Sequence, residues 1–157
     1  MTNSVHIDLL GTETRFVESG DYRTRVIEVS NNKAPLILLH GGGGHAETFS
    51  RNLNSLAAVC RPIAMDFIWH GMSSRPSFSD GSATDDVHWL RQFTLQVIDL
   101  MEVLGLQSAS FEGESLGGWV ALDLAINFTG RVDARVLNTA WGIALDKERV
   151  EAGAAGL

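Results

Sequence analysis

The sequence predicts one α/β domain with a mostly parallel sheet and an antiparallel hairpin at its N-terminal end. Two alternating segments joined by Gly-Asp predict the hairpin, and a continuous apolar run over residues 34–40 predicts a strand buried on both faces. Strand-like and helix-like segments then alternate along the chain. Such alternation implies crossover helices between parallel strands, so helices should cover both faces of the sheet.

Composition excludes several classes of protein. The chain has 157 residues, 45% of them hydrophobic, and a formal net charge of −7 without a cluster of basic residues, which argues against a nucleic-acid partner. Cys60 is the single cysteine and cannot form an internal disulfide. The N-terminal residues lack the pattern of a secretory leader, and no apolar run approaches the roughly 20 residues that span a bilayer. We therefore expect a cytoplasmic protein with a small-molecule substrate and no nucleic-acid or membrane partner.

The N-terminal third should form three strands. Residues 14–19 (TRFVES) and 22–29 (YRTRVIEV) alternate polar and apolar side chains, and the Gly-Asp between them is typical of a hairpin turn. Residues 34–40 (APLILLH) follow as the buried strand, and the four glycines after it require a loop.

The first crossover helix should follow this loop. Phe49, Leu53 and Leu56 recur at the spacing of one helical face, and the pattern closes before Pro62. Residues 62–67 (PIAMDF) then form the next strand.

A long amphipathic helix follows the turn-rich segment at residues 70–86. Ser82 and Asp85 have the spacing of a capping box, and the helix should run to Gly105. Its buried side would consist of Val87, Leu90, Val97, Met101 and Leu104.

The alternation continues with one more strand, helix and strand. Residues 108–113 (SASFEG) are strand-like, residues 116–129 are helix-like with Gly130 beyond their end, and residues 134–141 (ARVLNTAW) form another strand. The chain therefore carries about six strands.

A nucleophile elbow is predicted before the last of these helices. Gly113, Ser115 and Gly117 fit the pattern Gly-x-Ser-x-Gly, which needs the glycines because a Cβ at either position would collide with the neighbouring strand or helix. The amide of Leu116 would lie at the helix N-terminus, where its N–H has no partner in the helix and favours an anion beside Ser115. The pattern is short, so a glycine-rich turn beside an incidental serine is the alternative.

A glycine run supplies the context of this elbow. Residues 40–44 (HGGGG) follow the buried strand, and ligands of a parallel sheet bind outside the carboxyl ends of its strands, so this loop and Ser115 should meet. An exposed amide of the run would aim a second N–H at an oxyanion. The run lacks the Lys-Ser/Thr of a phosphate-binding loop and no metal-ligand set is apparent, so we expect no cofactor.

These motifs carry a resemblance to the α/β-hydrolase fold family over about residues 14–141. HGGGG resembles its oxyanion loop, DFIWHGMSS its Asp-x-x-x-His-Gly-x-Ser turn, and GESLGGW its nucleophile elbow. Within the fold, the combination of GGGGHAETFSRN, GESLGGWVA and RVLNTA is most similar to hydrolases that cleave carbon–carbon bonds in meta-cleavage products of aromatic degradation. The resemblance implies Ser115 as the nucleophile and the amides of Gly42 and Leu116 as the oxyanion hole. It favours Gly42 over Gly43, a choice that the residues alone leave open.

The resemblance also narrows the chemistry. It implies hydrolysis of carbon–carbon bonds or of carboxylic esters, and it disfavours dehalogenase and epoxide hydrolase chemistry because those relatives carry aspartate where Ser115 stands. Two positions depart from the pattern. Trp69 stands where relatives often have glycine, and Glu114 stands where many carbon–carbon hydrolases have asparagine.

A serine hydroxyl needs a base that a carboxylate orients, and in this family both follow the serine along the chain. No histidine follows Ser115 in the sequence, and each of the five has a plainer structural account: His6, His40, His45, His70 and His88. The acid is also unassigned. Asn138 stands where some relatives carry it, and Asp146 and Glu148 are typical of solvated surface.

We therefore expect an N-terminal fragment of a hydrolase, with residues 1–142 as part of the core domain and residues 143–157 as the start of a cap region. The sheet would be truncated after about six strands, so its last strand would be an unpaired edge and the chain alone would be inactive and poorly soluble. The alternative is a non-catalytic small-molecule binding protein that keeps the pocket. Trp119, Phe49 and Trp141 are candidates for lining this pocket, and packing in the core is at least an equal alternative for each of them. A homo-oligomer of the full-length protein is left open.

Overall fold

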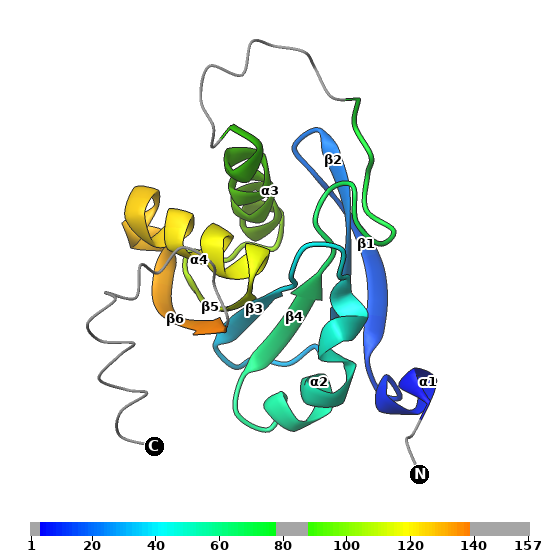
Figure 1. Ribbon diagram of the computed structural model, residues 1–157. Coiled ribbons are helices and arrows are strands. Elements are labelled where there is room, and N and C mark those ends of the chain that lie inside the picture. Colours follow the sequence, from blue (N-terminus) through cyan, green and yellow to red (C-terminus); the bar gives the residue numbers. More distant parts are fainter. Residues whose placement is uncertain (1–3, 78–87, 139–157) are drawn as a thin grey trace, which may run out of the picture.

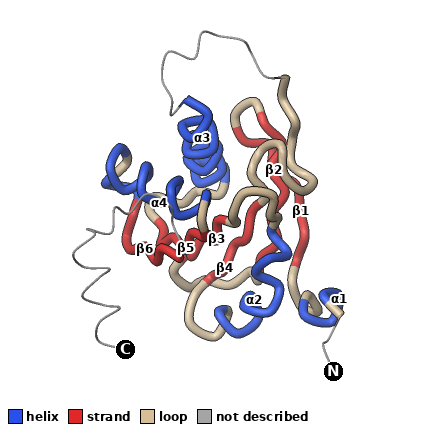
Figure 2. Tube along the Cα trace, viewed as in Figure 1, coloured by secondary structure: helices blue, strands red, loops and turns tan. Residues whose placement is uncertain are grey.

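The computed structural model describes residues 4–77 and 88–138 (Figure 1). The capping box expected at Ser82 and the cap region expected at residues 143–157 lie outside the described residues. The described chain is a single sheet with helices on both faces, as Figure 2 shows.

Six strands form one sheet in the order β1-β2-β4-β3-β5-β6. Their bounds are Glu13–Ser19 for β1, Tyr22–Glu28 for β2, Pro35–Leu39 for β3, Arg61–Met65 for β4, Ala109–Glu114 for β5 and Val132–Asn138 for β6. The β1–β2 and β2–β4 pairs are antiparallel, whereas β4, β3, β5 and β6 run parallel. The predicted fold class and its N-terminal hairpin are therefore confirmed.

The helices between the parallel strands lie where the sequence pattern predicts, and two short elements, α1 and η2, are additions. The helical segments are α1 (Val5–Asp8), the 3-10 turn η1 (Ala46–Phe49), α2 (Ser50–Leu56), α3 (His88–Val103), α4 (Leu116–Asn127) and the 3-10 turn η2 (Thr129–Arg131). The pattern did not predict α1, a single turn in which Ser4 Oγ accepts a hydrogen bond from the His6 N–H. The turn has four residues and buries none of their side chains. It is therefore too short and too exposed to show the apolar spacing by which a helix is predicted.

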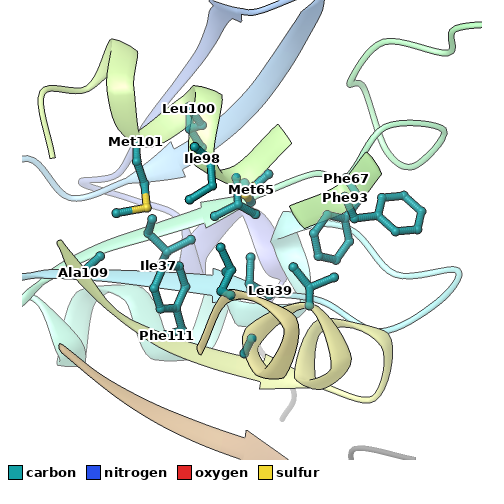
Figure 3. Close-up of a cluster of buried hydrophobic side chains, with 14 of the residues drawn as sticks. Ile37, Leu39, Met65, Phe67, Phe93, Ile98, Leu100, Met101, Ala109 and Phe111 are labelled. Atoms are coloured by element: carbon teal, nitrogen blue, oxygen red, sulfur yellow. The ribbon is translucent and has the colours of Figure 1, made fainter. Parts of the chain in front are cut away.

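Two hydrophobic cores lie on opposite faces of the sheet, and β3 contributes to both. Ile37 and Leu39 face the larger core, which α3 and α4 cover, whereas Leu38 faces the smaller core under α2. Figure 3 shows Ile37 between Met101 of α3 and Phe111 of β5, with Leu39 farther along the strand in the same cluster. Burial on both faces explains why this strand reads as an unbroken apolar run.

The amphipathic pattern of α3 is confirmed for the described residues. Leu90, Val97 and Met101 are buried in the larger core, and Leu104 packs against it while partly exposed. Val87 lies outside the described residues.

Within the described part of the chain, β6 is an edge strand of the sheet. There β6 pairs with β5 alone, and its residues 133–136 are exposed, with Val136 at 61%. Ile126, on α4, is 71% exposed. The described residues thus include the edge strand that the sequence predicted.

Candidate active site

Ser115 occupies a strained turn between β5 and α4. Its φ of 50° and ψ of −108° lie outside the regions that non-glycine residues ordinarily adopt. The Ser115 N–H donates to the Asn138 carbonyl at 2.9 Å, and the Ser115 carbonyl accepts from the Trp119 N–H at 3.2 Å. The end of β6 and the first turn of α4 therefore hold the serine in this conformation.

Close packing requires glycine on both sides of this turn. A Cβ on Gly113 would lie 2.5 Å from the carbonyl carbon of Gly117 and 2.6 Å from the backbone nitrogen of Gly118. A Cβ on Gly117 would lie 2.5 Å from the carbonyl carbon of Leu39 in β3. Backbone atoms cannot move aside as a flexible side chain can, so both positions exclude larger residues.

The glycine run after β3 lies against the serine. A Cβ on Gly41 would stand 3.4 Å from Ser115 Cβ and 3.6 Å from the Glu114 carbonyl oxygen, so the loop passes close to the elbow with little room for a larger residue. Gly42, Ser115 and Leu116 line one cavity of about 300 Å³, the serine cavity. The tertiary structure thus brings together the three residues predicted as nucleophile and oxyanion hole.

Two tryptophans complete the lining of the serine cavity. Trp89 of α3 and Trp119 of α4 stack with ring centroids 6.3 Å apart and an angle of 26° between their planes. The sequence analysis named Trp119 but missed Trp89. The sequence offered one indication, a large aromatic residue outside the buried side predicted for this helix, and the structure leaves Trp89 41% exposed. Phe49 follows the core-packing alternative, because it packs in the smaller core on the other face of the sheet. Trp141 lies outside the described residues.

His40 is fully buried and fixes the start of the glycine loop. Its Nε2 accepts from the Phe67 N–H at 3.1 Å, so the ring proton lies on Nδ1, which donates to the Gly41 carbonyl at 2.7 Å. Burial lowers the pKa of His40 from 6.5 to about 4. The ring is therefore neutral near pH 7 and acts as a bridge between two backbones.

The Asp-x-x-x-His-Gly-x-Ser turn after β4 folds around Asp66. The Asp66 carboxylate accepts from the Met72 N–H at 2.7 Å, and a Cβ on Gly71 would overlap that carboxylate. Trp69 has a φ of 62°, in the left-handed region that favours glycine, and its indole N–H donates to the Pro76 carbonyl at 2.7 Å. The backbone of this turn explains why glycine suits the position that Trp69 occupies here.

Three of the other histidines also have partners or lie at the surface, and the side chain of His88 lies outside what the structure describes. His45 Nδ1 is 2.8 Å from a Glu47 carboxylate oxygen, and His70 Nδ1 donates to the Ile68 carbonyl at 2.9 Å. His6 is exposed on α1. The candidates for the catalytic acid are no better placed: Asn138 ends β6 opposite Glu114 of β5, and the structure does not describe Asp146 and Glu148.

A second cavity, of about 410 Å³, lies on the α2 face of the sheet. Glu112, Glu114 and Asn138 line it beside Phe49. Burial raises the pKa of the Glu112 carboxyl, and the negative charge of Glu114 raises it further. Within the described residues, Glu112 Oε2 is buried without a hydrogen-bond partner.

Residues 4–77 and 88–138 contain neither a metal-ligand cluster nor a membrane-spanning helix. No group of three or more His, Cys, Asp or Glu side chains in these segments could hold a metal ion. No helix in them has both the length and the apolar character needed to cross a bilayer.

Comparison with curated proteins finds relatives of much greater length. Human (lyso)-N-acylphosphatidylethanolamine lipase is 32% identical over 116 residues, which are 73% of this chain and 32% of the lipase. Human 1-acylglycerol-3-phosphate O-acyltransferase ABHD5 is 33% identical over 113 residues, which are 71% of this chain and 31% of that protein. The chain thus spans about a third of the length of the curated relatives it matches.

Solved structures and a family model agree on the fold. The 2-hydroxy-6-oxo-6-phenylhexa-2,4-dienoate hydrolase of Rhodococcus sp. strain RHA1 superposes with a TM-score of 0.72 at 26% identity, over 80% of this chain and 45% of that one. A mutant of the meta-cleavage product hydrolase CumD gives 0.73 at 27% identity, over 84% and 47%. These matches confirm the resemblance inferred from the motifs. Residues 34–155 match the model of the alpha/beta hydrolase fold, and the chain therefore belongs to the α/β-hydrolase fold family.

Proposed function

We propose that the chain is the nucleophile-bearing part of a serine hydrolase, with Ser115 as the nucleophile and the amides of Gly42 and Leu116 as its oxyanion hole. The observation that carries the proposal is that these three residues line one cavity, with Ser115 on a strained elbow. Strained backbone geometry clusters at functional sites, because the surrounding structure must maintain it. A glycine-rich turn without a role would not need its serine in this conformation.

The proposed reaction begins with attack of Ser115 Oγ on a substrate carbonyl carbon. The Oγ–C bond forms as the carbonyl π electrons move to oxygen, and the hydroxyl proton passes to a base. Leu116 is the first residue of α4, so its N–H has no acceptor within the helix and meets the developing oxyanion at the positive end of the helix dipole. The Gly42 N–H would be the second donor. The leaving group then departs with a proton, and water hydrolyses the acyl-enzyme.

The base is proposed to be a histidine that lies beyond the printed sequence. His40 lies directly before the glycine loop and is buried, but both of its ring nitrogens already form hydrogen bonds with the backbone. The much greater length of the curated relatives is consistent with a base on a later segment. We also propose that the substrate is a small molecule met in the cytoplasm.

The serine cavity favours an apolar group next to the reacting carbonyl. Trp89, Trp119 and Leu116 present apolar side chains beside Ser115, so an acyl chain or an aromatic ring would be desolvated there. The curated relatives are named as a lipase and an O-acyltransferase, which favours a carboxylic ester, whereas the two solved hydrolases favour a carbon–carbon bond. In the second case, ketonisation of the dienol would precede attack by serine or water.

Turnover in the complete protein tests the proposal. p-Nitrophenyl hexanoate and 2-hydroxy-6-oxo-6-phenylhexa-2,4-dienoate would be supplied to the parent and to Ser115→Ala. We expect one of the two substrates to be hydrolysed, and we expect Ser115→Ala to lose at least about 10³-fold in kcat. Turnover that Ser115→Ala leaves unchanged would overturn the proposal. Residues 1–157 alone should show no turnover above that of Ser115→Ala.

A non-catalytic binding protein is the second candidate. It is favoured by the apolar lining of the serine cavity, which could hold a small apolar molecule whether or not a base is present. The test uses the same complete protein and follows tryptophan fluorescence, since Trp89 and Trp119 line the cavity. Saturable quenching by an apolar carboxylic acid without turnover of either substrate would support binding alone.

A further inference from the structure

The loop that carries Gly42 is held at its two ends. Gly42 and Gly43 are exposed, and no atom lies within 4 Å of where a Cβ would stand on either. At the first end, His40 joins the loop to the backbone of Phe67. At the second end, the Ala46 N–H donates to Asp66 Oδ1 at 2.7 Å. The position of the Gly42 amide therefore depends on these two anchors.

The second anchor depends on a buried carboxylate. Asp66 is fully buried, and its two oxygens accept from two loops, Oδ1 from Ala46 and Oδ2 from the Met72 N–H. A buried carboxylate stays ionised only with a counter-charge. Arg25 of β2 supplies it: Arg25 Nη2 lies 3.2 Å from Oδ1, and Arg25 Nε lies 2.8 Å from Oδ2.

Arg25 is itself held in place from the side of the loop. Its side chain is 4% exposed, and its Nη1 donates to Glu47 Oε1 at 2.8 Å while Nη2 contacts Oε2. Burial lowers the pKa of Arg25, but the hydrogen bond to Glu47 and the charge of Asp66 raise it overall, so the guanidinium stays charged. Glu47 follows Ala46 directly in the chain. The Arg25 guanidinium thus contacts both Asp66, which accepts from Ala46, and Glu47, the residue after Ala46.

We propose that Arg25 is a positioning residue of the active site, which holds the Ala46 end of the glycine loop, and with it the Gly42 amide, over Ser115. This inference rests on the proposed function. Without Arg25, the buried Asp66 carboxylate would lose the two guanidinium contacts that fix its position, and the hydrogen bond that it accepts from the Ala46 N–H would lose its fixed geometry. The Gly42 amide would then no longer be held in a fixed position relative to Ser115.

Kinetics of the complete protein give the first test, with Arg25→Met, Arg25→Lys and Arg61→Met compared. Arg61 is the matched control, because it also pairs with a fully buried carboxylate of β2, Glu28, at 2.8 Å. We expect Arg25→Met to lower kcat about 10- to 100-fold with KM within about twofold, because a misplaced oxyanion donor affects the transition state most. Arg25→Lys should recover part of the loss, and Arg61→Met should leave kcat within about twofold. An equal loss in Arg61→Met, or an unchanged kcat in Arg25→Met, would overturn the proposal.

Amide NMR separates this proposal from the proposed function. In Arg25→Met, hydrogen exchange of the Ala46 amide should accelerate at least about tenfold and the Gly42 cross-peak should shift, whereas Arg61→Met should change neither. If the parent hydrolyses neither substrate, the catalytic proposal fails while these amides still test the anchor. If Ala46 and Gly42 are unchanged in a folded Arg25→Met protein, Arg25 does not position the loop.

Discussion

Gly117 of α4 packs against the carbonyl group of Leu39 in β3, with no room between them for a methyl group. A Cβ on residue 117 would lie 2.5 Å from the Leu39 carbonyl carbon and 2.8 Å from Leu39 Cβ. This contact brings the N-terminus of α4 down onto the strand that leads into the glycine loop. The elbow and the oxyanion loop therefore share one packing constraint.

Gly117→Ala should destabilise the protein by at least about 3 kcal/mol, because neither backbone can move without disrupting the sheet. Gly130→Ala is the matched control, since no atom lies within 4 Å of its Cβ position. We expect the control to change the free energy of unfolding by less than about 1 kcal/mol. Urea unfolding followed by circular dichroism measures both. A Gly117→Ala protein as stable as the control would show that the elbow packs less closely than described.

The strain at Ser115 predicts a reversed preference between glycine and alanine. Ser115→Gly should be more stable than Ser115→Ala by about 1 kcal/mol, because glycine adopts a φ of 50° and a ψ of −108° without steric cost. At Ser110, inside β5, the order should be the usual one, with alanine more stable by about 0.5–1 kcal/mol. The two pairs are compared by urea unfolding. The same order at both positions would argue against backbone strain at the elbow.

His40 should make stability depend on pH between about 4 and 6.5. The folded protein keeps the ring neutral down to about pH 4, whereas the unfolded chain binds a proton near pH 6.5, so the unfolded state takes up more protons as the pH falls. The contribution of His40 is fully present above pH 6.5, and up to about 3 kcal/mol of it is lost by pH 4. His40→Gln should flatten the curve of unfolding free energy against pH in this window. Parallel curves for the two proteins would contradict this assignment.

Glu112 should be a destabilising residue at neutral pH. Its Oε2 is buried without a hydrogen-bond partner in the described residues. Burial raises the pKa of its carboxyl, and the negative charge of Glu114 raises that pKa further. A carboxyl whose pKa is raised by folding binds its proton more tightly in the folded state, so its cost appears as the pH rises. Glu112→Gln should therefore stabilise the protein at pH 7 by about 1 kcal/mol or less and by nothing near pH 4. Glu102→Gln, at the surface, is the control; a pH-independent gain in Glu112→Gln would point to packing instead of charge.

The sequence alone determined the order and type of the strands and of the helices between the parallel strands, together with the location of the elbow, because these depend on local spacing. Apolar period distinguishes strands from helices, and Gly113, Ser115 and Gly117 lie within five consecutive positions. Even the meeting of the elbow with the glycine loop followed from a general rule, since both come at carboxyl ends of parallel strands.

Only the tertiary structure decided which side chains surround the serine and what lies beneath the loop. A helical pattern shows that Phe49 and Trp89 belong to helices, but it does not say which face of the sheet each helix covers, and the two residues lie by different cavities. Arg25 is 41 residues from Asp66 in sequence, and their pairing arises because β2 lies next to β4 in the sheet. Contacts of this kind depend on strand order and crossover side, which local residue spacing does not encode.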